Sequence, residues 1–158
     1  MLPIVIVVFA AWLSISSALL HGHNATARLN ALVADTAAMN FLNYRQSVAQ
    51  QFRVQNPLPA GQNSIAQATL VFPPGFIPGD RWANLIVGGQ LYCYSVAPLT
   101  PNSTSVPPLM LDAVYQQSGR HIMVGIKLED GNLSGPPVWF WAGLPKEIPV
   151  GSIVYIGG

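Results

Sequence analysis

The chain has 158 residues, which leaves room for one globular domain of ordinary size. Only 8% of its residues are charged and the formal net charge is +1, so the sequence offers no basic field to hold a nucleic-acid backbone. The single cysteine, Cys93, excludes an internal disulfide and a CxxC redox pair. Because it lies in an apolar and aromatic run, it is expected to be a small buried side chain.

The first twenty residues contain no charged side chain and are almost continuously apolar. A helix from Leu2 to Leu20 rises about 28 Å, close to the roughly 30 Å of hydrocarbon in a bilayer. Segment 1–20 is therefore predicted to be a transmembrane anchor. The alternative is a cleaved signal peptide, for which Ser16-Ser17-Ala18 offers a site. However, no Lys or Arg precedes the apolar run, and that run is longer than most signal-peptide cores.

Segment 21–57 is predicted to be an amphipathic helix, after a loop-like junction at residues 21–24. The sequence leaves open whether the two helices are continuous. Asn56-Pro57 is expected to end the second helix. The two histidines of the junction have no third ligand nearby, so no metal site is predicted there. The apolar positions recur at spacings of three and four, which is typical of a helix with one buried face: Leu29, Val33, Ala37, Phe41, Tyr44, Val48 and Phe52.

Segment 58–158 is predicted to be a β-rich globular head that forms one domain with the amphipathic helix. Short apolar runs alternate with Pro and Gly, and Gly88-Gly89 between two such runs indicates a β-hairpin. The fold class expected is α+β, with the helix packed on an antiparallel sheet that follows as a meander. The expected elements are strands at 68–72, 82–87, 90–96, 120–128, 138–142 and 152–156, and a short helix at 109–117.

No catalytic motif is present in the sequence. It lacks a nucleophile elbow, a P-loop, a GxGxxG fingerprint and an HExxH zinc motif. His121 is the only histidine of segment 58–158. Among its acids, Asp80 lies in an expected loop, Glu129-Asp130 lies in an expected turn, and Asp112 points outward from the expected short helix. The chain is therefore predicted not to be an enzyme and to need no cofactor or metal. A small periplasmic hydrolase that uses His121 is a competing hypothesis.

Aromatic side chains are the candidates for a partner-binding surface. In the expected strand 138–142, alternation places Trp139 and Trp141 on one face. Tyr92 and Tyr94 lie on the expected hairpin and are candidates in the same way. Such residues pack in a core or, where exposed, are enriched at contact surfaces. The sequence leaves both interpretations open.

The order and spacing of several segments in the first 95 residues resemble the PilM family of type IVb thin pilus biogenesis proteins from conjugative plasmids. The segments are the N-terminal apolar run, Asn40-Phe41-Leu42-Asn43-Tyr44-Arg45, Asn56-Pro57, Leu70-Val71-Phe72-Pro73-Pro74-Gly75-Phe76 and Trp82-x-Asn84-x-Ile86-x-x-Gly89-x-x-Tyr92-x-Tyr94.

This resemblance implies a bacterial inner-membrane protein with its body in the periplasm and no catalytic residues. It also implies a scaffold or basal-body role in pilus assembly during conjugation, with other pilus assembly proteins as partners. Low charge and a Gly- and Pro-rich body are compatible with a homo-oligomer. The alternative function is a secreted or surface binding module whose apolar segment is a cleaved signal peptide.

Overall fold

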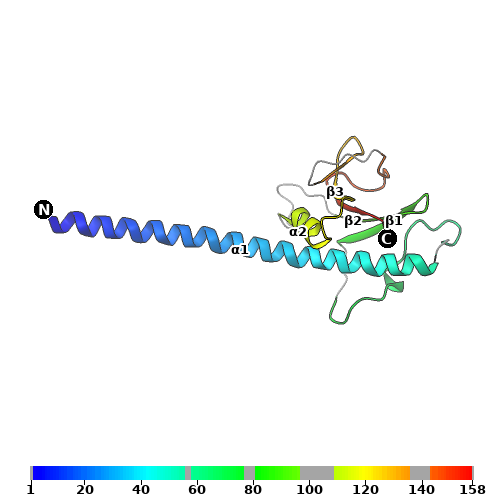
Figure 1. The fold of residues 1–158 in the computed structure, drawn as a ribbon, viewed down its shortest axis with the longest axis horizontal. Coiled ribbons are helices and arrows are strands. Elements are labelled where there is room, and N and C mark those ends of the chain that lie inside the picture. Colours follow the sequence, from blue (N-terminus) through cyan, green and yellow to red (C-terminus); the bar gives the residue numbers. More distant parts are fainter. Residues whose placement is uncertain (1, 56–57, 77–80, 97–108, 136–142, 158) are drawn as a thin grey trace.

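The structure is a computed structural model that describes residues 2–55, 58–76, 81–96, 109–135 and 143–157, with side chains from residue 25 onward. One long helix, α1 (Leu2–Gln55), extends far beyond a head that gathers around its C-terminal part (Figure 1). The other elements are η1 (Gln67–Thr69), β1 (Trp82–Val87), β2 (Gln90–Ser95), α2 (Met110–Gln117), β3 (Val124–Lys127), β4 (Leu133–Ser134) and β5 (Ile153–Ile156). The α+β class with an antiparallel sheet is confirmed.

The two predicted helices are one continuous helix of 54 residues, so the loop-like junction expected at residues 21–24 was wrong. No proline lies between Pro3 and Pro57, and a single glycine inside a helix costs only about 1 kcal/mol relative to alanine. Gly22 alone therefore does not interrupt propagation of the helix.

Among the helices whose side chains the structure describes, none is long and apolar enough to cross a membrane. The predicted anchor, segment 1–20, lies outside the residues with described side chains.

The buried face of α1 was predicted correctly in its second half and wrongly in its first. Phe41, Tyr44 and Val48 lie in the main core, as the spacing indicated. Leu29 and Val33, in contrast, are 62% and 54% exposed. The head covers α1 only from about Ala34 onward, and the small side chains there lie against it: Ala34, Ala38 and Ala49 are buried.

The sheet has the order β1-β2-β5-β3-β4, and every neighbouring pair is antiparallel. The predicted hairpin is confirmed: β1 and β2 are joined by Gly88 and Gly89, which have φ values of 58° and 77°. Such positive φ values suit the tight two-residue turn of a hairpin. The sheet is not the expected meander, because β5, the last strand in the chain, lies between β2 and β3.

The strand predicted at 68–72 was wrong, and β4 was not predicted. The chain at this point forms η1, in which the Thr69 amide donates to the Ala66 carbonyl oxygen at 3.0 Å. Leu70 is buried in the main core, and the Phe72 ring stacks on Tyr44 with ring centres 6.4 Å apart. This apolar run therefore packs against α1 and adds no strand to the sheet. The strand predicted at 138–142 lies outside the described residues.

Both faces of the sheet are covered. One face packs against α1 and α2, and the other forms a second cluster around Leu85, Leu133 and Ile148.

The run 120–128 was predicted to be a half-buried strand, yet Lys127 in β3 is only 5% exposed. Its ammonium donates to the carbonyl oxygens of Pro145 and Ile148, both at 2.6 Å. Desolvation lowers the Lys127 pKa, because burial disfavours the charged form.

A buried amide joins α1, β1 and the segment after α1. The Nδ2 of Asn84 donates to the Tyr44 hydroxyl and to the Ile65 carbonyl oxygen, each at 2.9 Å. Its Oδ1 accepts the Ile65 amide at 2.7 Å. The Asn84 side chain thus pairs with both backbone groups of Ile65, as a neighbouring strand would. The Ile86 amide extends this pairing by donating to the Asn63 carbonyl oxygen.

We expect Asn84→Ala to lower the free energy of unfolding by about 2–4 kcal/mol, because it leaves several buried polar groups without partners. Tyr44→Phe should cost less, about 1 kcal/mol, since only one partner is removed. Urea unfolding followed by circular dichroism measures both changes. Gln50→Ala, on the exposed side of α1, is the control and should change stability by less than about 0.5 kcal/mol. Equal losses for all three variants would contradict this role of Asn84.

The second prediction concerns Cys93, which is fully buried in β2 as its sequence context indicated. Desolvation raises the pKa of its thiol from 9.0 to about 12. Because the folded pKa is raised, the contribution to stability is complete below pH 9.0 and is lost progressively as the pH rises toward 12.

We therefore expect the wild-type protein to lose about 1 kcal/mol more stability than Cys93→Ala between pH 9 and pH 10. Tyrosines with raised pKa values, such as Tyr44, are present in both proteins and cancel in the comparison. Urea unfolding at the two pH values gives the difference. Parallel pH profiles of the two proteins would show that the thiol titrates normally in the folded state.

Candidate functional site

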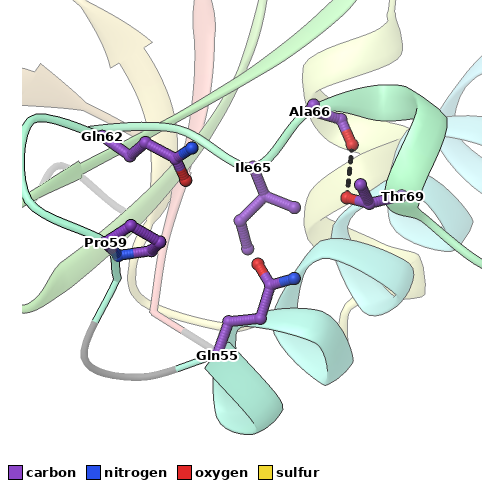
Figure 2. Close-up of a pocket in the computed structure, with 6 residues that line it drawn as sticks. All are labelled: Gln55, Pro59, Gln62, Ile65, Ala66 and Thr69. Atoms are coloured by element: carbon purple, nitrogen blue, oxygen red, sulfur yellow. Dashed lines mark hydrogen bonds between the residues drawn. The ribbon is translucent and has the colours of Figure 1, made fainter.

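The hollow at the C-terminal end of α1 has a volume of about 390 Å³ and is shown in Figure 2. The helix contributes Gln55, and the segment that follows contributes the remaining lining residues: Pro59, Gln62, Ile65, Ala66 and Thr69. This segment turns sharply, because the Gln62 amide donates to the Pro59 carbonyl oxygen at 3.1 Å. The bonds from Asn84 then hold Ile65 in place beneath the hollow.

The chemistry of this hollow suits binding. Among the described residues, its lining contains two side-chain amides, one hydroxyl and apolar groups, with no acid, base or thiol. The Thr69 hydroxyl already donates to the Ala66 carbonyl oxygen at 2.8 Å, as the dashed line in Figure 2 shows. A neutral polar segment of a partner could accept and donate hydrogen bonds here, while bond cleavage would require groups that the lining lacks.

Two further hollows lie beside α1. One has a volume of about 260 Å³ between α1 and α2, where Asp35 and Asp112 contribute carboxylates and Gln117 donates to the Asp35 backbone carbonyl oxygen at 3.2 Å. The other has a volume of about 490 Å³ and is lined from α1 alone, with Arg45 and Arg53 at its ends. Opposite charges therefore line different parts of the same helix.

Arg45 is bound to the head through two contacts. Its Nε and Nη2 atoms donate to the Gly157 carbonyl oxygen at 3.3 and 3.0 Å. Its guanidinium carbon also lies 4.3 Å from the centre of the Tyr155 ring, a cation–π contact. The His121 ring stacks on the same tyrosine with ring centres 5.0 Å apart. The Arg45 charge thus holds β5 against α1.

Two of the predicted partner-binding residues lie in the second core cluster. Tyr92 is only 7% exposed, and Tyr94 is half-buried against the same cluster. Burial raises the pKa of both phenols, and the nearby Glu147 raises that of Tyr94 further. Trp139 and Trp141 lie outside the described residues. A partner-binding role for these four residues stays a prediction, and for Tyr92 the accessible surface is small.

The structure also identifies residues that the sequence interpretation missed. Asn84 shares a face of β1 with Trp82 and is equally buried, so a polar residue in an inward position was the available signal. Arg45 follows the buried Tyr44 and is half-buried, so a charged residue beside the apolar stripe of α1 was the corresponding signal. Both residues lie in segments that carry the family resemblance, 40–45 and 82–94, but the resemblance assigned neither of them a role.

In the described part of the chain, no group of three or more His, Cys, Asp and Glu residues could hold a metal ion. His121 is exposed, and its Nδ1 accepts the Met123 amide at 3.3 Å. The described residues thus offer binding hollows along α1 and a histidine engaged in the turn before β3.

Comparison with known proteins identifies the family. The model of the PilM family matches residues 7–156. The chain is also similar to a protein named PilM from Escherichia coli B7A, known from its crystal structure, with a TM-score of 0.58 and 15% sequence identity. That alignment covers 78% of this chain and 90% of the other, and at this identity it shows a shared fold. No curated protein matches the chain. Since the family match extends over nearly the whole sequence, this chain belongs to the PilM family.

Proposed function

We propose that this chain is a non-enzymatic scaffold or basal-body protein of type IVb thin pilus assembly in conjugation. Membership of the PilM family indicates a role in pilus biogenesis. The proposal adds a cellular location and a mechanism. Segment 1–20 anchors the chain in the bacterial inner membrane, and the head lies in the periplasm. There it binds other pilus assembly proteins.

The observation that carries the proposal is the continuity of α1. A helix of 54 residues is about 80 Å long at 1.5 Å per residue. The head packs around its C-terminal part, while the N-terminal part, which includes the uncharged segment 1–20, projects away (Figure 1). An unbroken helix transmits position and orientation, so such a chain would hold its head at a fixed distance from the bilayer.

The surfaces of the head support binding as its activity. The hollow in Figure 2 presents Gln55, Gln62 and Thr69 without a charged group, and the hollow with Arg45 and Arg53 presents positive charge. Partners with neutral polar or acidic segments fit these surfaces. His121, the residue on which a hydrolase would depend, contacts Tyr155 and Met123.

An anchor exchange tests the proposal. In a host that lacks the chromosomal or plasmid copy, segment 1–20 would be replaced by a cleavable signal peptide or by an unrelated transmembrane helix. We expect the first exchange to export a soluble head and abolish thin pili and transfer in liquid. The second should retain both, because the anchor acts by position. Electron microscopy counts the pili, and mating in liquid measures transfer.

The location of the wild-type protein is the companion measurement. A C-terminally tagged copy should stay in the inner membrane after carbonate washing, with the tag accessible from the periplasm. A processed, soluble wild-type protein that still supports piliation would overturn the anchor and favour a secreted or surface binding module. Normal pili in the deletion strain would overturn the assembly role itself.

Substitution of His121 tests whether the chain is an enzyme. We expect His121→Ala to leave transfer frequency within about twofold of the wild type, because a non-enzymatic protein would lose only the stacking on Tyr155 and the bond from the Met123 amide. His121→Gln, which can still accept the Met123 amide, is the matched control for folding. A loss of transfer of several hundredfold in both variants, with normal protein levels and thermal stability, would support a hydrolase instead.

A further inference from the structure

Four large apolar side chains lie exposed on the part of α1 that emerges from the head. Leu29 and Leu32 are each 62% exposed, Val33 is 54% exposed and Met39 is 58% exposed. All four lie within three helical turns on one side of α1. The face that packs against the head is centred elsewhere, with Phe41 roughly 120° around the helix from Leu29. The helix therefore has a second apolar face that nothing in the described structure covers.

The spacing of this face is that of a coiled-coil seam. Counting back from Met39, steps of three and four residues alternate and meet only apolar, small or threonine residues. These positions, which we call the seam, are Ala11, Ile15, Ala18, Gly22, Ala25, Leu29, Leu32, Thr36 and Met39. An average step of 3.5 residues is the repeat that keeps one stripe of a helix against a partner helix.

Charged residues avoid the seam. Arg28 and Asp35 are seven residues apart and occupy the same flanking position of the repeat. In a parallel, in-register pair, the partner's residue opposite such a position lies five residues further along. Val33 then faces Arg28, whose methylene groups can cover it, and Asn40 faces Asp35, whose carboxylate can accept its amide. Two identical helices therefore meet without opposing like charges.

We propose that α1 forms a parallel, in-register homodimer through this seam. A second copy fits because each seam residue then meets its own equivalent, so every side chain is matched in size and polarity. An antiparallel pair would bring the head of each copy against the uncharged segment 1–20 of the other. A lipid surface fits less well, because a helix that lies on a membrane needs several cations on its polar face and only Arg28 is present from residue 25 to residue 44.

The dimer goes beyond the proposed function and does not depend on it. Parallel pairing would place both heads at one end and both N-terminal segments at the other, which suits two chains anchored in one membrane. The seam residues 25–39 would pair equally in a soluble protein. Dimer formation and membrane location can therefore be tested separately on the same samples.

Cysteine cross-linking of the full-length chain tests the proposal directly. Leu32→Cys lies on the seam, and Asn30→Cys lies on the other side of the same exposed turn as its control. The native Cys93 does not interfere, because it is fully buried. After oxidation in cells, we expect Leu32→Cys to run as a covalent dimer on a non-reducing gel and Asn30→Cys to run as a monomer. Mass spectrometry of the band identifies both halves as this chain.

A double variant provides a second measurement on the purified full-length protein. Leu29→Lys with Leu32→Lys should halve the sedimentation mass, from two chains to one, and lower the melting temperature, because the variant loses the stabilisation that association provides. Near-UV circular dichroism should still show a folded head, since both side chains are exposed in the single chain and lie outside its core. Three results would overturn the proposal: equal cross-linking at residues 30 and 32, a monomeric wild-type protein, or a Leu32→Cys adduct to a different protein. None of them bears on whether the chain is retained in the inner membrane.

Discussion

The side chain of Asn84 is the interaction on which the arrangement of helix, sheet and connecting segment depends. A single buried amide contacts Tyr44 on α1 and both backbone groups of Ile65, while its own backbone belongs to β1. The segment after α1 forms no strand at Ile65, so the bonds from Asn84 take the place of strand-to-strand hydrogen bonds along the β1 edge of the sheet. Because hydrogen bonds in a low-dielectric interior are directional and costly to leave unmade, Asn84 fixes the distance between α1 and β1 more sharply than apolar packing alone would.

The residues around this network explain why the head is attached to only half of α1. Arg45 holds β5 through Tyr155 and Gly157, and α2 packs on the small residues Ala34 and Ala38. Ala31 lines a hollow together with Leu109 and Asp112, so the head meets the helix at about this residue. The same helix therefore serves as a core element in its second half and as an exposed rod in its first. This division of one helix between two tasks accounts for its low charge, since neither a buried face nor an apolar seam tolerates many ions.

Local signals predicted the elements that depend on local chemistry. The hairpin at Gly88-Gly89 and the short helix predicted at 109–117 follow from glycine geometry and apolar spacing, and the structure contains both, the helix as Met110–Gln117. The position of β5 in the sheet could not be predicted from the sequence. The alternation of apolar residues in a strand indicates which side chains are buried, but it does not indicate which strands lie beside that strand. Similarly, the spacing on α1 predicted one apolar stripe, whereas Leu29 and Phe41 belong to two faces. For the candidate site, Asn84 and Arg45 stand in segments that carry the family resemblance, but their partners could not be predicted, because an isolated polar residue does not indicate which group it bonds.

The position of β5 also governs the order in which the head can fold. The pairs β1–β2 and β3–β4 each form from nearby residues, but β5 lies between them and is made after both. Until Ile153–Ile156 has emerged, each pair presents an unpaired edge and the two halves of the sheet have no direct contact. Contacts between residues so distant in sequence form slowly. In a chain that crosses a membrane N-terminus first, the sheet would therefore stay incomplete until the end of transport. Pairing of β5, the last strand to arrive, would then join its two halves in one step.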